Sequence, residues 1–314
     1  MQKLPMIFPG QASQAVGMAA DLMEREGAAA GFLGAVDHIL GYGLTAVMRE
    51  GPAETLTETR NAQPAILAHS VAATFALGEL GIEPSLVAGH SLGEFSAAVA
   101  CGALSPEDAL RTVRMRGQLM FAAGREVPGT MAAVMGLGGP RVAEVCAGVD
   151  GVVVLANHNS DTQVVISGEV AAVTAAGEAL KAAGARRVQP LNVSGAFHSP
   201  LLAGAAEEFR TFLAGIAIAA PRVPLVANVS AAPVTDAVQL REGFSRQLTA
   251  PVLWHDTLER ICGGPEPPRV VLEVGPGKVL SNLARRAYPD VTFVPVGTVA
   301  DLEGLPALLA GLAG

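Results

Sequence analysis

Residues 85–101 read Ser-Leu-Val-Ala-Gly-His-Ser-Leu-Gly-Glu-Phe-Ser-Ala-Ala-Val-Ala-Cys and carry the strongest structural signal in the chain. The short apolar run Ser85–Gly89 predicts a buried strand, and the Ala-rich run from about Leu92 to Cys101 predicts a helix. Similar strands and helices alternate in both directions, which indicates an α/β fold. We predict further strands at residues 4–8, 223–228 and 269–274. We predict further helices at residues 61–80 and 105–123, after Pro200, from about Val252, and after the turn at residues 275–277.

The order of predicted elements changes between about Pro128 and Ser194. There we predict strands at residues 131–137, 152–156, 163–166 and 187–193, with helices at residues 140–147 and 169–183. The resulting order, βαββαβ, is that of a ferredoxin-like domain. We therefore predict a large α/β domain formed by residues 1–127 and 195–314, and a small ferredoxin-like domain, residues 128–194, inserted into it.

Length and composition are those of a compact enzyme. The chain has 314 residues, of which 50% are hydrophobic and 16% charged, so a disordered protein is excluded. The mean hydropathy is +0.41, but no uninterrupted apolar run reaches the roughly 18 residues of a membrane-spanning helix. The segment Met1–Gly10 lacks the length and cleavage site of a signal peptide. We expect a cytoplasmic protein with no membrane partner.

Charge and cysteine content exclude further classes of function. The net charge is −8, and the longest basic runs are arginine pairs at residues 186–187 and 285–286, so nucleic-acid binding is not expected. Cys101, Cys146 and Cys262 are too few and too scattered for a disulfide framework or a zinc site, and we expect buried thiols. No dinucleotide-binding glycine motif occurs, and no His/Cys cluster has metal-ligand spacing. We therefore expect neither a metal nor a cofactor.

The turn between the first predicted strand and helix reads G-x-S-x-G. Gly89 and Gly93 flank Ser91 because side chains at those positions would clash in so tight a turn. Such a turn raises the serine above the strand, and the helix N-terminus points free N–H groups at its oxygen. We predict Ser91 as a nucleophile and the Leu92 N–H as an oxyanion donor; an ordinary glycine-rich βα turn is the alternative.

A serine nucleophile needs a base, and the chain has six histidines. His90 adjoins Ser91, but neighbouring side chains on a tight turn diverge. His198 lies where the predicted small domain rejoins the large one, and a base at such a seam would face a cleft. His198 is therefore the preferred base, by a modest margin.

The predicted helix at residues 105–123 carries one arginine on its apolar face. Ser105 as N-cap and Pro106 at the first helical position mark its start. Advancing about 100° per residue places Arg116 on the apolar side with Val113 and Met120, whereas a separate polar stripe contains Arg111, Arg114, Gln118 and Arg125. Burying an unpaired guanidinium is costly, so a carboxylate should meet it. The pattern alone allows either an internal salt bridge or a ligand carboxylate.

Five motifs, in order, resemble those of the malonyl-CoA:acyl-carrier-protein transacylase family, over essentially the whole chain. They are Phe8-Pro-Gly-Gln-Ala-Ser-Gln14, Gly89-His-Ser-Leu-Gly-Glu94, Met115-Arg-Gly117, Gly195-Ala-Phe-His-Ser199 and Gln247-Leu-Thr-Ala-Pro-Val252. The resemblance implies an α/β-hydrolase-like large domain with a ferredoxin-like insertion. One departure is Ala12, where the family usually has glycine; if that position needs a positive φ, a small effect on rate is expected.

The resemblance also implies an activity and a site. The expected reaction transfers malonyl from malonyl-CoA to the phosphopantetheine thiol of acyl carrier protein through a malonyl-serine, for fatty-acid elongation. Ser91 and His198 would form a dyad, with the Gln247 carbonyl orienting His198 and the Gln11 and Leu92 N–H groups forming the oxyanion hole. The residues expected to bind substrate are Arg116 for the malonyl carboxylate, Gln247, Met120 and Phe197, the last being typical of malonyl-selective members.

The sequence is also compatible with other functions. The same fold could serve a polyketide synthase or a malonate decarboxylase. A serine hydrolase would need an acid between serine and histidine, and Asp161 or Glu178 could be nominated, although both fall in the predicted small domain. A non-catalytic carrier-binding module is a third reading. An acidic carrier would dock on a local basic patch, for which we nominate Lys278, Arg285 and Arg286.

Overall fold

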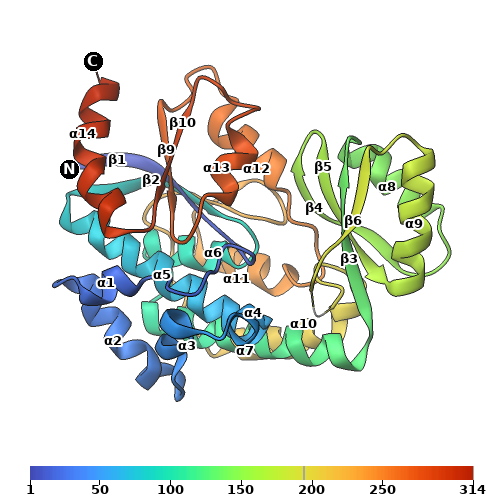
Figure 1. Cartoon of the computed structure of the whole chain (residues 1–314), viewed down its shortest axis with the longest axis horizontal. Coiled ribbons are helices and arrows are strands. Elements are labelled where there is room, and N and C mark those ends of the chain that lie inside the picture. The colour runs from blue at the N-terminus through green and yellow to red at the C-terminus, as the bar shows by residue number, and fades with distance from the viewer. Residues whose placement is uncertain (194, 314) are drawn as a thin grey trace.

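The computed structural model describes residues 1–193 and 195–313 and has a mixed α/β fold with two separate sheets (Figure 1). Ser194 and Gly314, the predicted last residues of the small and large domains, lie outside the described residues. Within the described chain, no helix is both long and apolar enough to cross a membrane. The three cysteines are buried free thiols, as predicted.

The large sheet has six strands in the order β10-β9-β1-β2-β7-β8. Their bounds are Gln2–Phe8 (β1), Ile82–Gly89 (β2), Leu225–Val226 (β7), Pro233–Val234 (β8), Val270–Val274 (β9) and Thr292–Val296 (β10). All neighbours are parallel except β7 and β8. Phe8 at the end of β1 pairs with Gly89 at the end of β2, so the loops after these two strands meet at one edge of the sheet.

Helices that pack on this sheet, and further helices that pack on them, bury most of the core. They include α5 (Thr59–Glu79), α6 (Gly93–Ala100), α7 (Pro106–Glu126), α10 (Ala203–Ala214) and α11 (Ala237–Arg246). The start of α7 is as predicted, because the Ser105 hydroxyl accepts from the Asp108 N–H at 3.0 Å and Pro106 opens the helix. Phe95 on α6 stacks on Phe244 with ring centroids 4.4 Å apart, which fixes α6 against α11.

The small sheet has four antiparallel strands in the order β4-β5-β3-β6. The chain runs β3 (Gly129–Met135), α8 (Gly139–Ala147), β4 (Val153–Ser160), β5 (Gln163–Glu169), α9 (Val170–Ala182), β6 (Arg187–Pro190), which is the predicted βαββαβ order. Figure 1 shows α8 and α9 on the face turned away from the large sheet. A separate apolar core lies between these helices and the strands.

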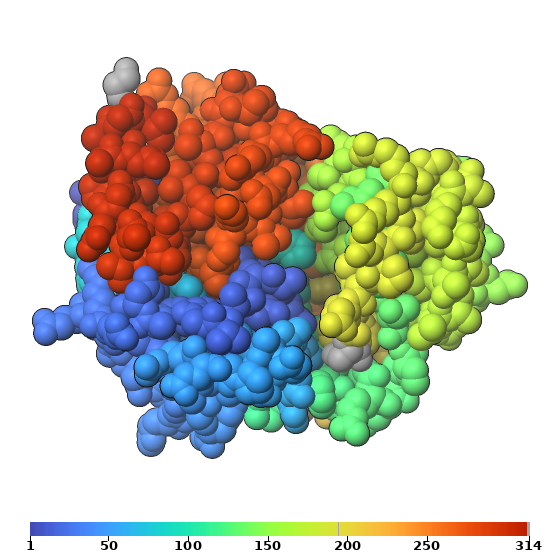
Figure 2. Space-filling view, viewed as in Figure 1, coloured from blue at the N-terminus to red at the C-terminus, as the bar shows by residue number. Residues whose placement is uncertain are grey.

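Backbone hydrogen bonds join the small sheet to the large part of the chain. The His158 N–H on β4 donates to the Val252 carbonyl at 2.9 Å, and the Val252 N–H donates to the Ala156 carbonyl at 2.9 Å. Val252 lies just before helix α12 (Trp254–Cys262). Figure 2 shows a hollow in the surface where the two parts of the molecule meet.

Several elements differ from the prediction. Unpredicted ones are α1 (Ala20–Glu24), α2 (Ala28–Leu40), α3 (Leu44–Glu50), α4 (Ala53–Thr57), α11, β8, β10 and α14 (Val299–Ala313). The strand predicted at 223–228 is only the two residues of β7, and the strand predicted at 187–193 ends at Pro190. The remaining elements, η1 (Pro200–Leu202) and α13 (Val279–Ala284), follow the predicted pattern of helices.

Candidate active site

Ser91 sits in a strained turn between β2 and α6. Its φ is 51°, in the left-handed region that residues with a Cβ rarely adopt. A Cβ at Gly89 would clash with the backbone of Gly93, and a Cβ at Gly93 would clash with the Phe8 carbonyl. The two glycines therefore let the turn close against the end of β1, with the Ser91 hydroxyl projecting from it.

His198 contacts the Ser91 hydroxyl. Its Nε2 lies 2.8 Å from Ser91 Oγ, and its Nδ1 lies 2.9 Å from the Gln247 carbonyl oxygen and 3.2 Å from that of Ala250. Two carbonyl acceptors require the proton on Nδ1, which leaves Nε2 as an acceptor for the serine proton. Burial, together with the nearby Arg116 charge, lowers the pKa of His198 to about 3. The ring is therefore neutral at physiological pH, and its Nε2 lone pair faces the Ser91 hydroxyl.

Arg116 projects from α7 to the same point and is 1% exposed. Its Nη1 donates to Gln63 Oε1 at 2.7 Å, and its Nη2 donates to Gln247 Oε1 at 2.8 Å and to Ser91 Oγ at 3.0 Å. Its Nε is buried without an acceptor among the described residues. Burial lowers the pKa of Arg116 to about 10, so the side chain stays charged at neutral pH. The described contacts include no carboxylate, which leaves the charge available to a ligand.

The predicted oxyanion donors lie beside Ser91. Leu92 precedes the first turn of α6, where backbone N–H groups have no partner within the helix. Gln11 follows β1, and its side-chain oxygen accepts from the Thr59 hydroxyl at 2.8 Å. Ala12 has a φ of 80°, so the position where the resembled family usually has glycine does need a positive φ.

These groups open into a cavity of about 190 Å³ between the large and small sheets. Seven of the eight predicted site residues line it: Gln11, Ser91, Leu92, Arg116, Met120, Phe197 and His198. The small-sheet part of the chain contributes Met131, Asn157 and residues 191–193. Gln247, the eighth, is fully buried and lies behind Arg116, with its side chain bonded to the guanidinium.

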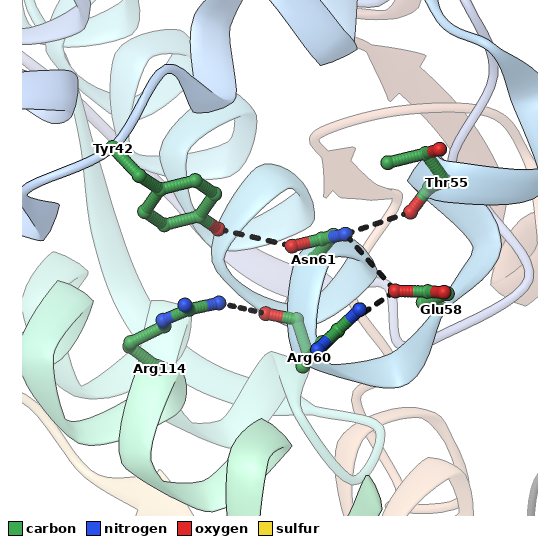
Figure 3. Close-up of polar contacts among 6 residues, drawn as sticks. All are labelled: Tyr42, Thr55, Glu58, Arg60, Asn61 and Arg114. Carbon is green, nitrogen blue, oxygen red and sulfur yellow. Dashed lines mark hydrogen bonds and ion pairs between the residues drawn. The ribbon is translucent and has the colours of Figure 1, made fainter.

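The first turn of α5 is held by a polar network away from the cavity (Figure 3). The Asn61 side chain donates to the Thr55 carbonyl at 2.9 Å and accepts from the Tyr42 hydroxyl at 3.3 Å. Arg114, on the predicted polar stripe of α7, donates to the Arg60 carbonyl at 3.0 Å. The network fixes the end of α5 that carries Gln63, the acceptor for Arg116 Nη1.

His90 diverges from Ser91, as expected. Its Nε2 lies 2.9 Å from Asn159 Oδ1, and its ring meets Trp254 edge-on at 5.5 Å between centroids. Burial lowers the pKa of His90, so this ring is also neutral.

Sequence reasoning missed two buried polar residues behind Ser91. Asn228 accepts from the Ser91 N–H at 2.7 Å, and its side chain donates to the Gly89 carbonyl at 2.6 Å. Glu94 accepts from the Asn228 N–H at 3.0 Å. Glu94 could have been found from its pattern, because it is the one charged residue of the buried helix α6; Asn228 has no such signal.

No metal-binding cluster of three or more His, Cys, Asp and Glu side chains occurs within the described ranges. The residues that line the cavity offer acid–base and hydrogen-bonding groups: a hydroxyl, a neutral imidazole, a guanidinium and backbone N–H groups.

The amino-acid sequence is similar to that of known proteins over nearly its whole length. The model of the acyl transferase domain family matches residues 6–303. The chain is 42% identical to the malonyl CoA-acyl carrier protein transacylase of Bacillus subtilis (strain 168), over 306 residues that cover 96% of each protein. It is 40% identical to the protein of the same name from Haemophilus influenzae, over 98% of this chain and 100% of that one.

Solved structures agree in fold. The crystal structure of an acyl carrier protein S-malonyltransferase from Vibrio cholerae superposes with a TM-score of 0.91 at 41% identity, covering 97% of this chain and 100% of that one. A malonyl-transacylase solved in complex with a type II PKS acyl-carrier protein superposes with a TM-score of 0.91 at 39% identity, covering 96% and 98%.

Proposed function

The chain belongs to the malonyl-CoA:acyl carrier protein transacylase family, and we propose that Ser91, His198 and Arg116 carry out its reaction. The enzyme is an acyltransferase that moves malonyl from malonyl-CoA to acyl carrier protein. One observation supports the residue assignment above the others. Ser91 Oγ lies 2.8 Å from a neutral imidazole and 3.0 Å from a buried guanidinium that no described carboxylate contacts.

In the first half-reaction, Ser91 Oγ attacks the thioester carbonyl of malonyl-CoA while His198 Nε2 takes the hydroxyl proton. The Gln11 and Leu92 N–H groups donate to the oxyanion, each contributing roughly 3–4 kcal/mol in comparable sites. The intermediate collapses by breaking the C–S bond. The coenzyme A sulfur leaves with the proton from His198, and a malonyl-serine ester remains.

In the second half-reaction, the phosphopantetheine thiol of the carrier gives its proton to His198 and attacks the ester. Collapse breaks the C–O bond, and the proton returns from His198 to Ser91 Oγ. The Gln247 and Ala250 carbonyls hold the Nδ1 proton throughout, so the same tautomer serves both halves.

Arg116 selects the acyl group in this proposal. Its planar fork can grip a carboxylate with two hydrogen bonds, whereas an acetyl group would leave the buried charge without a partner. Met120 and Phe197, both buried at the cavity wall, would bound the acyl group. Gln247 supports Arg116 from behind instead of touching the substrate.

We also propose the domain boundaries, the cellular location, the pathway and the carrier-docking surface. We place the catalytic domain at residues 1–127 and 195–314 and the inserted domain at residues 128–194. We assign the enzyme to the cytoplasm and to fatty-acid elongation. The carrier would dock near Lys278, Arg285 and Arg286, which are exposed on and beside α13, a helix that approaches β4 of the small sheet.

Intact mass spectrometry tests the proposal. The protein is mixed separately with malonyl-CoA, acetyl-CoA and methylmalonyl-CoA. A malonyl adduct should form rapidly, be released slowly by water and quickly by a carrier thiol, and be absent from Ser91→Ala. Rapid release by water would favour a serine hydrolase, and a malonyl adduct on Ser91→Ala would refute the nucleophile assignment.

A further inference from the structure

Glu94 is a buried carboxylate that no step of the mechanism above uses. It is 1% exposed and lies in the first turn of α6. Its Oε1 accepts from the Asn228 N–H at 3.0 Å, and its Oε2 accepts from the side-chain amide of Gln247. A carboxylate is costly to bury, so a carboxylate held in this way, directly behind Ser91, calls for an explanation.

The Gln247 amide joins Glu94 to Arg116. Its Nε2 donates to Glu94 Oε2 and to the Ser91 carbonyl, the latter at 3.0 Å, while its Oε1 accepts from Arg116 Nη2 at 2.8 Å. The two ends of an amide are chemically different. Reversing it would set an NH₂ group against the guanidinium and an oxygen against the carboxylate, and both contacts would be repulsive.

We propose that Glu94 positions Arg116 for the malonyl carboxylate by fixing the side-chain amide of Gln247. This proposal rests on the function proposed above. A neutral amide between the two charges keeps their attraction while leaving the guanidinium without a contacting carboxylate. A direct ion pair between Glu94 and Arg116 would occupy the same donors and compete with the substrate.

Burial and hydrogen bonding act on the charge of Glu94 in opposite directions, and the hydrogen bonds favour the ionised form. Burial raises the pKa of Glu94 to about 7, and its hydrogen bonds and the Arg116 charge act in the opposite direction. Both oxygens of Glu94 face N–H donors, which is the pattern that an ionised carboxylate satisfies and a protonated one does not.

The test is Glu94→Gln, assayed by the rate of acyl-enzyme formation with malonyl-CoA and with acetyl-CoA. The new side chain has nearly the same size, and its oxygen can still accept from the Asn228 N–H. Its NH₂ group, however, would face the NH₂ group of Gln247, so the amide loses its anchor. The malonyl rate constant kcat/KM should fall at least about tenfold, the effect of losing one charge-assisted hydrogen bond. The acetyl value should change less than about threefold on the same scale.

Glu273→Gln is the matched control. Glu273 on β9 is also fully buried and accepts two N–H groups, those of Leu280 and Ser281, at 2.9 and 2.7 Å. This variant should lower the melting temperature and leave the malonyl-to-acetyl ratio unchanged. The control thus separates the general cost of neutralising a buried glutamate from the effect on selectivity.

Equal losses with both substrates in Glu94→Gln would overturn the proposal. If that variant fails to fold, Glu94→Asp provides the test, because its carboxylate is withdrawn by one methylene and cannot hold both donors. An Asp variant with the full malonyl preference would also overturn the proposal. Failure of the wild type to form a malonyl adduct would instead refute the proposed function, so the two failures are distinguishable.

Discussion

The Arg116 guanidinium donates to the Ser91 hydroxyl at 3.0 Å, so the proposed carboxylate receptor touches the proposed nucleophile. His198 Nε2 approaches the same oxygen at 2.8 Å. A substrate carboxylate that engages Arg116 would draw this donor away from Ser91 Oγ. Recognition of the malonyl group and release of the hydroxyl for attack would then be one event.

Arg116→Ala should invert the acyl preference. Losing a buried charge-assisted pair should cost about 2–5 kcal/mol for malonyl transfer, or about 30- to 4000-fold in kcat/KM. Acetyl transfer should be maintained or should rise, because no guanidinium is left unpaired. The measurement is the malonyl-to-acetyl ratio of adduct formation. Arg111→Ala, which removes an exposed arginine from the polar stripe of the same helix, should leave the ratio unchanged. An unchanged ratio in Arg116→Ala would contradict the assignment.

The acylation rate should not titrate near pH 6.5. His198 has its pKa lowered to about 3 by burial and by Arg116, so the ring stays neutral and able to accept a proton in mildly acidic buffer. The rate of acyl-enzyme formation from acetyl-CoA, which does not depend on Arg116 binding a carboxylate, should be flat from pH 8 to pH 5. A fall centred near pH 6.5, the ordinary histidine value, would be incompatible with this environment.

The same shift predicts how stability depends on pH. The unfolded chain binds the His198 proton near pH 6.5, whereas the folded protein does so only near pH 3. The contribution of this residue to stability is therefore present above about pH 6.5 and is lost as the pH falls toward 3. The difference in unfolding free energy between wild type and His198→Gln should decrease by about 1.4 kcal/mol per pH unit in that range. Urea unfolding curves measure it, and a constant difference would argue against a buried neutral ring.

Ala12→Gly should stabilise the protein. Ala12 has a φ of 80°, and this conformation costs a residue with a Cβ about 1–2 kcal/mol, against a smaller entropic cost of glycine in the unfolded chain. The unfolding free energy should rise by up to about 1 kcal/mol, and the transfer rate should change little. The exposed Ala15, whose φ is not positive, is the control, and Ala15→Gly should be destabilising. A destabilised Ala12→Gly would show that the left-handed conformation is not strained.

Charge reversal of Lys278, Arg285 and Arg286 to Glu should weaken docking of the carrier. The KM for carrier protein should rise about tenfold or more, and most at low salt, because an acidic partner is attracted by local charge. The KM for malonyl-CoA should stay within about twofold on the same reasoning. The control reverses three exposed cations that already form surface ion pairs, Arg141, Lys181 and Arg210. Equal effects of the two triple variants on KM for the carrier would contradict a local docking patch.

Much of the fold was predictable because its elements repeat a strong local pattern. The order of β2, the turn at Ser91 and α6 follows from an apolar run, two glycines and an Ala-rich segment. The βαββαβ order of the small sheet was predictable for the same reason. Helices α1, α3 and α4 were missed because they have only five to seven residues each, and α2, which has 13, because Ala and Gly weaken its apolar pattern. The apolar faces of α2, α3 and α4 are completed by contact with α5, and that of α1 by contact with α2.

The site residues also fall into those that a local sequence pattern predicts and those that it does not. Ser91 and Arg116 stand out in the sequence, one by its turn and the other as a charge on an apolar face. The link between Glu94 and Gln247 joins side chains 153 residues apart, and that between Glu94 and Asn228 spans 134 residues. No local pattern predicts contacts between residues so far apart in the sequence. These contacts form only when the loop after β7 and the end of α11 pack over the start of α6.

The backbone seam between β4 and Val252 has a practical consequence for recombination. Val252 exchanges hydrogen bonds with Ala156 and His158, and the Ala250 carbonyl two residues earlier accepts from His198. Grafting residues 128–194 from a relative with a different acyl preference would therefore replace one side of these hydrogen bonds. The other side lies in the segment whose carbonyl groups hold the His198 ring. A chimera that carries only the inserted segment would misplace the His198 ring and lose activity, irrespective of the acyl group that its pocket fits. Exchanging residues 247–252 along with the segment would keep both sides of the seam from one parent.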